Sequence, residues 1–191
     1  FSNYGKVECT ECDQGYYADK TIEATECISC PSGQYGSGVV VADRINEGDA
    51  CNKCVTGKYS KAKGADSDET CIDCQPGKKA KDVEAATEET EACTSCLVGQ
   101  YRSSTDTDLT KCIDCPTGKT LGAEGGSKCI DCIPGRFSGA VGSKSKDCGK
   151  CPVGYSTEEG AGTNTIPTQD KCIACLLGTY ADIEGLTKCL A

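Results

Sequence analysis

The residues that could do chemistry in this chain are its cysteines, which make up 19 of the 191 residues. Eighteen of them form nine C-x-x-C pairs, and the last one, Cys189, would open a tenth pair. The pairs are Cys9/Cys12, Cys27/Cys30, Cys51/Cys54, Cys71/Cys74, Cys93/Cys96, Cys112/Cys115, Cys129/Cys132, Cys148/Cys151 and Cys172/Cys175. Thiols at this spacing can act as a redox dithiol, bind zinc or form structural disulfides. Which of these three chemistries applies decides the class of the protein.

Redox catalysis fits the pattern poorly. Closing a C-x-x-C onto itself makes a strained, easily reduced bond, and nine catalytic motifs in one chain are implausible. Zinc is the stronger rival, because pairs separated by 13 to 20 residues match the spacing of zinc ribbons. Zinc ribbons join two pairs per ion, however, and the chain has no His for a mixed site. A zinc-binding array therefore stays a minor alternative.

The composition favours disulfides. Val, Ile, Leu and Phe together number 28, about 15% of the chain, and the net charge is -9. So few large apolar side chains would normally leave a chain disordered, because burial could not offset the conformational entropy. Cysteine at about 10% instead marks a cross-linked scaffold, and such bonds persist in oxidising compartments. The sequence predicts an extracellular or cell-surface location.

The elements that must position these cysteines form a repeat. Successive first cysteines are 17 to 24 residues apart, a period typical of stacked supersecondary units. Each unit has a glycine three residues after its second cysteine, which we call the turn glycine. The turn glycines are Gly15, Gly33, Gly57, Gly77, Gly99, Gly118, Gly135, Gly154 and Gly178. A glycine fixed at one position predicts a turn with positive φ, and Pro-Gly at 76/77 and 134/135 fits a type II turn.

Two residues after the turn glycine, six of the nine units have an aromatic residue. These are Tyr17, Tyr35, Tyr59, Tyr101, Phe137 and Tyr180. We expect each ring to pack over a disulfide or a neighbouring turn as a small core, with a sugar- or ligand-stacking platform as the alternative. Lys79, Thr120 and Ser156 depart from the pattern.

The remaining stretches are rich in Ser, Thr, Gly, Asp and Glu and predict short irregular hairpins with little or no helix. The two longest inserts, residues 30–51 and 151–172, could carry an extra strand near residues 39–41 or a mobile loop. Residues 81–92 are compatible with a helix but have no apolar stripe. The predicted fold class is a set of small disulfide-rich repeats forming an elongated rod.

Two schemes could pair the cysteines. In a ladder, the second cysteine of one pair joins the first cysteine of the next, from Cys12 with Cys27 to Cys175 with Cys189. Cys9 is then left over, with a partner expected upstream of Phe1 in a longer array. In a crossed scheme, Cys9 joins Cys27 and Cys12 joins Cys30, which leaves Cys175 unpaired. The equality of the repeats favours the ladder, but sequence does not settle connectivity.

The unit Cys27-x-x-Cys30-Pro31-x-Gly33-x-Tyr35 resembles the cysteine-rich repeats of the ephrin-receptor-like type, which are related to the growth-factor-receptor and tumour-necrosis-factor-receptor modules. The resemblance covers essentially the whole chain and is weakest in the three units without a ring. It implies a disulfide-bridged extended rod of the kind found in extracellular regions of receptors and in large surface proteins of protists and algae. It implies no shared catalytic residues.

Several functions are disfavoured. With no His and no nucleophile beside a base, the usual catalytic constellations cannot be assembled, so we expect neither an enzyme nor a cofactor. The excess of 29 acidic over 20 basic residues argues against nucleic-acid binding. Carboxylates such as Asp66, Asp68 and Asp106 are expected to lie on a solvated surface, with weak calcium binding as the alternative. The longest apolar run, residues 172–177, is too short to span a membrane.

We therefore expect residues 1–191 to be one continuous array, with units starting near residues 9, 27, 51, 71, 93, 112, 129, 148 and 172. The leading hypothesis is a structural segment of an extracellular rod, filament or surface appendage that associates with itself or with other extracellular structural proteins. Ser/Thr-rich stretches such as residues 103–110 and 156–168 could carry O-glycans. The alternative is a receptor ectodomain or protist surface antigen that binds a protein ligand through the two inserts.

Overall fold

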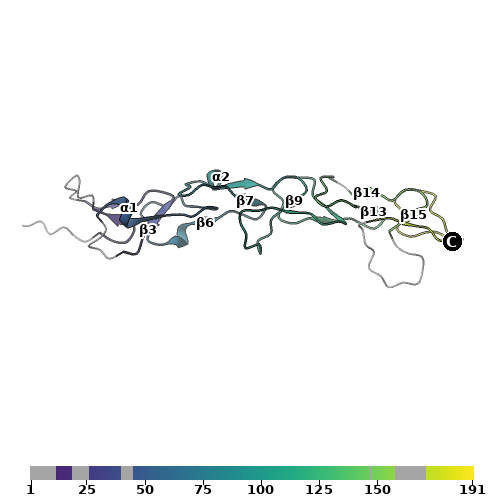
Figure 1. Cartoon of the computed structure of the whole chain (residues 1–191), viewed down its shortest axis with the longest axis horizontal. Coiled ribbons are helices and arrows are strands. Elements are labelled where there is room, and N and C mark those ends of the chain that lie inside the picture. Colours follow the sequence, from purple (N-terminus) through teal and green to yellow (C-terminus); the bar gives the residue numbers. More distant parts are fainter. Residues whose placement is uncertain (1–11, 19–25, 40–44, 147, 158–170) are drawn as a thin grey trace, which may run out of the picture. The chain divides into compact units, whose positions relative to one another are not determined.

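The computed structural model describes residues 12–18, 26–39, 45–146, 148–157 and 171–191. The chain divides into two compact units: the first comprises Phe1–Cys74 and Ala80–Thr94, and the second comprises Gln75–Lys79 and Ser95–Ala191. In the described residues of both units the regular structure is a succession of short antiparallel strand pairs, coloured along the sequence in Figure 1. The predicted fold class of disulfide-stapled hairpin repeats with little helix is confirmed.

Each sheet has two strands. In the first unit β1 (Tyr16–Tyr17) pairs with β2 (Ile28–Ser29), β3 (Gln34–Gly36) with β4 (Cys51–Lys53), and β5 (Lys58–Tyr59) with β6 (Ile72–Asp73). β7 (Lys78–Ala80) pairs with β8 (Cys93–Ser95). In the second unit β9 (Gln100–Tyr101) pairs with β10 (Ile113–Asp114), β11 (Lys119–Thr120) with β12 (Ile130–Asp131), β13 (Arg136–Phe137) with β14 (Gly149–Lys150), and β15 (Tyr155–Ser156) with β16 (Ile173–Ala174).

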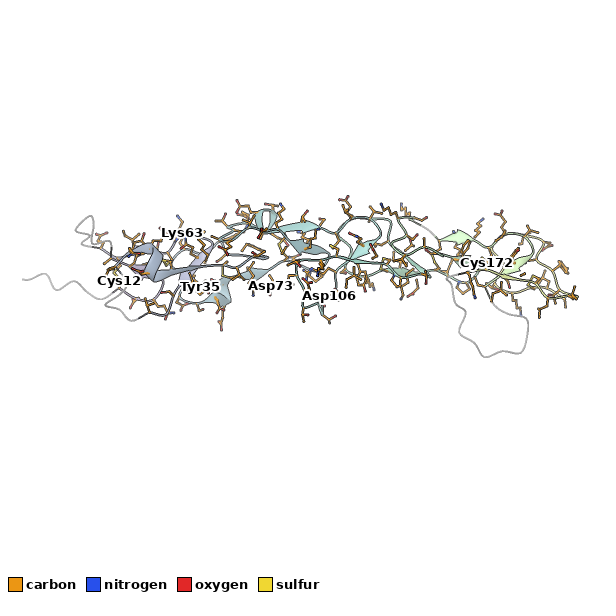
Figure 2. All side chains as sticks on the ribbon, viewed as in Figure 1. Cys12, Tyr35, Lys63, Asp73, Asp106 and Cys172 are labelled. Carbon is orange, nitrogen blue, oxygen red and sulfur yellow. A yellow bond between two sulfur atoms is a disulfide. The ribbon has the colours of Figure 1, made fainter. Side chains whose placement is uncertain are left out.

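Nine disulfides close the hairpins, with Cα–Cα distances of 5.6 to 5.8 Å; Figure 2 draws them as yellow bonds. They join Cys12–Cys27, Cys30–Cys51, Cys54–Cys71, Cys74–Cys93, Cys96–Cys112, Cys115–Cys129, Cys132–Cys148, Cys151–Cys172 and Cys175–Cys189. This is the pairing of the ladder scheme, and Cys9 lies outside the described residues. We number the repeats 1 to 9 by these disulfides in chain order.

The first strand of a hairpin follows the turn glycine, and its partner lies between the two cysteines of the next pair. The two strands of a hairpin are antiparallel. The ring position in the first strand pairs with the residue that directly follows the first cysteine of the next C-x-x-C pair: Tyr17 pairs with Ile28, and Tyr59 with Ile72. The adjacent residues point to the other face of the sheet, where the pairs Lys58/Asp73 and Lys119/Asp131 are charged. There Lys58 Nζ lies 3.1 Å from Asp73 Oδ1. Such an exposed ion pair contributes little stability, so the disulfide must hold the hairpin closed.

The cores are small and consist mainly of disulfides. In repeat 1 the ring of Tyr17 clusters with Cys30, Ala50 and Cys51 and packs against Ile28. The equivalent Tyr59 clusters with Cys74, Ala86, Ala92 and Cys93. Both rings are 9% exposed and each contacts the disulfide of the following repeat.

The other ring positions differ in burial. Tyr35, Tyr101 and Phe137 are half-buried, and Tyr180 is 52% exposed. At two of the positions without a ring, Thr120 and Ser156 are buried, and the Thr120 hydroxyl lies 3.2 Å from the Ser143 carbonyl oxygen.

Two short helices complete the first unit: α1 (Glu47–Ala50) and α2 (Glu89–Ala92), with a 3₁₀ turn, η3 (Asp68–Thr70). Asn46 caps the N-terminus of α1, and its side-chain oxygen accepts a hydrogen bond of 3.0 Å from the Asp49 N–H. The helices place Ala50 and Ala92 in the two small cores. An extra strand was expected near residues 39–41. Val39 is not part of a strand, and residues 40–44 lie outside the described part of the chain.

Candidate functional site

The candidate site is the repeated set of contacts between successive hairpins in the described residues, and the turn glycines lie at its centre. All nine turn glycines have positive φ, between 77° and 86°. In the Pro-Gly turns, the Lys78 N–H donates to the Gln75 carbonyl at 3.1 Å and the Arg136 N–H donates to the Ile133 carbonyl at 3.0 Å. A glycine with positive φ in third position and a proline in second position fit a type II turn.

Five turn glycines donate their N–H to a main-chain carbonyl of the next repeat, and the Gly135 N–H donates to the Thr157 hydroxyl at 2.9 Å. In the five main-chain bonds the acceptor is the carbonyl of the residue three positions after the next turn glycine, at 2.7 to 2.8 Å. The pairs are Gly33 with Ser60, Gly77 with Arg102, Gly99 with Leu121, Gly118 with Ser138, and Gly154 with Ala181. The acceptor residues are all buried. Neighbouring hairpins are therefore joined by main-chain hydrogen bonds, which most side-chain substitutions leave in place.

In five of the described hairpins, a second tight turn returns a bond to the preceding repeat. One residue of this turn donates its N–H to a cysteine carbonyl at 2.7 to 2.9 Å. The cysteine is the first of the two that form the disulfide of the preceding repeat. The pairs are Gly64 with Cys30, Ala85 with Cys54, Gly125 with Cys96, Gly142 with Cys115, and Gly185 with Cys151. All five donors have positive φ. We call these residues the second-turn residues.

Sequence analysis missed the second-turn glycines, although the sequence contains a signal for them. In four repeats a second glycine follows the turn glycine at a spacing of seven residues, in the pairs Gly57/Gly64, Gly118/Gly125, Gly135/Gly142 and Gly178/Gly185. The variable length of the other loops hides the spacing in the remaining repeats.

The turn glycines also contact the repeat after the next one. A Cβ placed on Gly77 would lie 2.0 Å from the Gly125 carbonyl oxygen, and one on Gly135 would lie 2.0 Å from that of Gly185. Gly33 approaches the Ala85 oxygen in the same way, at 2.1 Å. Positive φ and close backbone approach thus both require glycine at these turns. At Gly33, Gly77 and Gly135, a hairpin therefore contacts both of the two hairpins that follow it.

Ala85 is the one described residue other than glycine with positive φ, at 54°. Replacing Ala85 by Gly is expected to stabilise repeat 4 by about 1 kcal/mol, because the left-handed region costs an L-residue roughly 1–2 kcal/mol. Hydrogen exchange at the Ser60 N–H, which donates to the Ala86 carbonyl, measures the change.

Ala86→Gly is the matched control for Ala85→Gly. Ala86 is buried and does not have positive φ. Its replacement removes a packed methyl group and adds backbone freedom, so it is expected to destabilise the repeat by about 1 kcal/mol. Equal destabilisation by both substitutions would contradict the assignment of strain to Ala85.

Arg102 occupies a position where other repeats have small residues such as Ser60 and Ala181. It is 2% exposed. Its guanidinium donates from Nε to the Lys78 carbonyl and from a terminal nitrogen to the Gln75 carbonyl at 2.7 Å. The planar fork of arginine can bridge two carbonyls in this way, which a lysine ammonium on a single flexible stem does less well. Arg102 therefore fixes the turn of repeat 4 to repeat 5.

Replacing Arg102 by Ala is expected to destabilise this region by about 2–4 kcal/mol, because it removes two side-chain hydrogen bonds and leaves a cavity where the buried side chain was. Arg102→Lys should recover only part of the loss. Arg136→Ala is the control, since Arg136 is half-buried and donates to one carbonyl, that of Cys148. Native-state hydrogen exchange at the Gly77 N–H measures the change in stability. If Arg102→Ala lowers the protection of this N–H no more than Arg136→Ala does, the role assigned to Arg102 is refuted.

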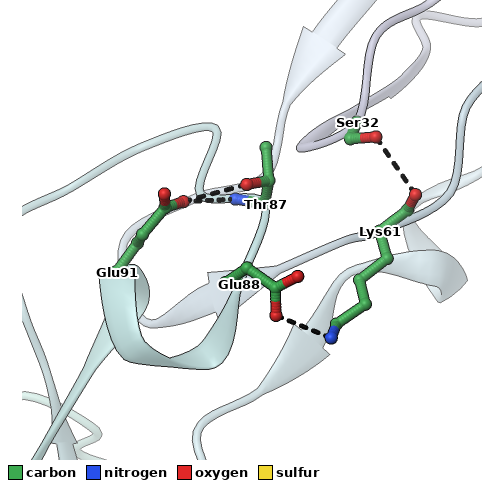
Figure 3. A network of polar contacts seen from close by, with 5 residues as sticks. All are labelled: Ser32, Lys61, Thr87, Glu88 and Glu91. Atoms are coloured by element: carbon green, nitrogen blue, oxygen red, sulfur yellow. Dashed lines mark hydrogen bonds and ion pairs between the residues drawn. The ribbon is translucent and has the colours of Figure 1, made fainter.

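Side chains in the first unit add a polar network across three repeats, shown in Figure 3. The Ser32 hydroxyl donates to the Lys61 carbonyl at 3.1 Å, and Lys61 Nζ lies 2.6 Å from Glu88 Oε2. Hydrogen bonding and charge attraction by Glu88 raise the pKa of Lys61. The Thr87 N–H and hydroxyl both donate to Glu91, which lowers the pKa of that carboxyl. These side chains are exposed, so the network contributes little stability.

The carboxylates that could have bound calcium form local hydrogen bonds. The Asp106 carboxylate accepts from the Ser103 N–H at 2.6 Å, in the loop labelled in Figure 2. The Thr110 hydroxyl and N–H, with Lys111, lower the pKa of Asp108 to about 2. Among the described residues, no three His, Cys, Asp or Glu side chains come together as a metal site. In the same part of the chain no helix has the length and apolar character of a membrane span.

These features define the class: the chain is a cysteine-rich repeat protein built from disulfide-closed hairpins. Residues 1–39 match the family model described as "Tyrosine-protein kinase ephrin type A/B receptor-like", a family of receptor-like cysteine-rich modules and not of enzymes. No curated protein matches the chain. The disulfides and the matched module point to an extracellular or cell-surface location.

Proposed function

We propose that this protein is a structural segment of an extracellular rod, filament or surface appendage, without enzymatic activity. The observation that carries the proposal is the repeated set of main-chain contacts from each hairpin to the next two within a unit. Such contacts depend on the repeat pattern and not on any single side chain. A scaffold can therefore gain length by adding repeats, without a larger core.

The sources of stability support this role. A disulfide that closes a loop of about 15 residues is worth roughly 3 kcal/mol in the chain-entropy model. Nine such bonds, spread evenly over the repeats, stabilise each hairpin locally. The variable loops are then free to change in sequence, and their Ser and Thr residues are candidate sites for O-glycans. We expect the partners to be copies of this chain or other extracellular structural proteins.

Immunoelectron microscopy of intact, unpermeabilised cells tests this function. An antibody against the native chain is expected to label an extracellular fibre or appendage at regular intervals. Extraction under reducing conditions should remove the label together with the fibre. Uniform label over a smooth cell surface, with no associated fibre, would contradict the structural role.

The receptor-like description of the matched module favours a second candidate, a ligand-binding ectodomain or surface antigen. The contact regions would be the loops of residues 30–51 and 151–172, of which residues 40–44 and 158–170 lie outside the described structure. A soluble protein that binds the isolated chain stoichiometrically, and whose binding is abolished by shortening these loops, would support the ectodomain. Saturable binding of this kind is not expected of a structural segment.

A further inference from the structure

Repeat 7 is basic, although the chain as a whole is acidic. From its first cysteine to the second cysteine of the next pair, residues 132–151, it has four cations against one carboxylate, a net charge of +3 in a chain of -9. Repeats 1 to 6 and repeat 8, counted in the same way, are neutral or acidic. The four cations are Arg136, Lys144, Lys146 and Lys150. Positive charge is thus gathered in one hairpin.

Two of these cations face each other across the hairpin. Arg136 in β13 pairs with Lys150 in β14, the strands labelled in Figure 1. In repeat 6 the equivalent pair is Lys119 with Asp131, whose Nζ and Oδ1 lie 2.6 Å apart. Like charges directly opposite each other destabilise a sheet. The pair Arg136/Lys150 therefore lowers the stability of its own hairpin, and a bound anion would reverse this effect.

The other two cations lie in a loop that the preceding repeat holds in place. The Thr120 hydroxyl of repeat 6 bonds the Ser143 and Ser145 carbonyls. Lys144 and Lys146 alternate with these two serines and are exposed. Thr120 stands at a ring position, so a residue that departs from the aromatic pattern anchors the basic loop.

The four cations have no anionic partner in the described part of the chain, where none of them forms an ion pair. Arg136 is half-buried and donates one guanidinium N–H to the Cys148 carbonyl at 2.8 Å, which orients the side chain. Lys144, Lys146 and Lys150 are exposed. An incoming anion would not have to displace a described carboxylate.

We propose that these four residues, Arg136, Lys144, Lys146 and Lys150, form a surface that binds an anionic polysaccharide outside the cell. We call it the basic surface. Arg and Lys bind sulfate and carboxylate groups through charge-assisted hydrogen bonds. The extracellular or cell-surface location favours a polysaccharide over other polyanions. The proposal goes beyond the structural function and does not require the chain to form a fibre.

A linear polymer suits this arrangement of charge. Its anionic groups recur along the chain, so one molecule can reach the cross-strand pair and the loop of the same hairpin. The acidic repeats elsewhere in the chain repel a polyanion, which confines the contact to repeat 7.

Fluorescence anisotropy of labelled polysaccharides with the full, oxidised chain tests the surface. The probes are dextran sulfate and polygalacturonate, which distinguish sulfate from carboxylate recognition, and neutral dextran is the control polymer. At least one of the two anionic probes is expected to bind, with an affinity that falls as the salt concentration rises. Absence of binding to both at low salt, or equal binding of neutral dextran, would overturn the proposal.

Substitutions at the basic surface separate local from overall charge. Lys144→Gln with Lys146→Gln is expected to weaken binding about tenfold, whereas Lys144→Arg with Lys146→Arg should bind like the wild type. Lys63→Gln with Lys79→Gln is the matched control, because both lysines are exposed and the change in net charge is the same. Equal weakening by the two Gln variants would assign binding to overall charge and overturn the proposal.

The acidic hairpins of a second copy are the alternative ligand, and sedimentation velocity without polysaccharide tests them. The expected result is the same mass for the wild type and for the chain with Lys144→Gln and Lys146→Gln. Self-association that these substitutions abolish would show that the basic surface binds another copy, which would overturn the proposal. Loss of polysaccharide binding would leave the structural function untouched, because the labelling of a fibre does not depend on it.

Discussion

Reduction of the nine disulfides is expected to unfold the chain at neutral pH and room temperature. The two buried clusters each contain one tyrosine and only one or two alanines beside their cysteines, which is too little apolar surface to offset the entropy of the chain. Losing roughly 3 kcal/mol for each closed loop removes more stability than such cores provide. Amide chemical-shift dispersion before and after addition of a phosphine reductant measures the transition.

The order of reduction gives a second readout. Cys175 and Cys189 are both half-buried, whereas Cys30–Cys51 and Cys54–Cys71 are buried at both ends. Because exchange requires access to sulfur, Cys175–Cys189 should be reduced before those buried bonds. A chelator should leave the oxidised chain unchanged. Retention of native dispersion after full reduction, or unfolding by the chelator, would contradict a scaffold held by disulfides.

Gly135→Ala is expected to disrupt repeats 7 to 9, at a local cost of about 3–5 kcal/mol. The new Cβ would meet the Gly185 carbonyl oxygen at 2.0 Å, and the contact is with backbone, which cannot rotate away. The positive φ of Gly135 adds roughly 1–2 kcal/mol of strain. Hydrogen exchange at the Gly185 N–H, which donates to the Cys151 carbonyl, measures the loss in the folded, oxidised chain.

Gly154→Ala is the control that separates backbone strain from the steric clash. Gly154 has nearly the same φ, but a Cβ there would have no described atom within 4 Å. Only the backbone strain of roughly 1–2 kcal/mol is therefore expected. If Gly135→Ala and Gly154→Ala lower the stability by the same amount, the close approach of Gly135 to Gly185 does not restrict the residue at this position.

The local structure was predictable because it depends on short-range patterns. A glycine three residues after each second cysteine indicates a turn, and all nine have positive φ. Polar stretches between cysteine pairs indicate short hairpins, which the described residues contain. The pairing was less certain, because equal spacing allows both a ladder and a crossed scheme, and only the positions of the cysteines in the fold distinguish Cys12–Cys27 from Cys12–Cys30.

The helix at residues 47–50 and the buried arginine were not predicted, whereas α2 lies at the end of the helix-compatible stretch of residues 81–92. Residues 47–50 and 89–92 form one helical turn each, too short for a periodic apolar pattern, and they matter because they deliver Ala50 and Ala92 to the cores. Arg102 looks like an ordinary surface residue in the sequence. Its guanidinium donates to carbonyls 24 and 27 residues away in the sequence, and only the fold brings these groups together.

The sequence by itself determined the repeat, its turns and its dependence on cysteine, because these follow from composition and from spacings of a few residues. Only the tertiary structure decided how one hairpin meets the next two. That contact brings together the backbones of residues such as Gly77 and Gly125, which are 48 positions apart in the sequence. A close approach of two main chains is visible in a sequence only as a glycine. The turn requires glycine at the same position, so the sequence does not separate the two requirements.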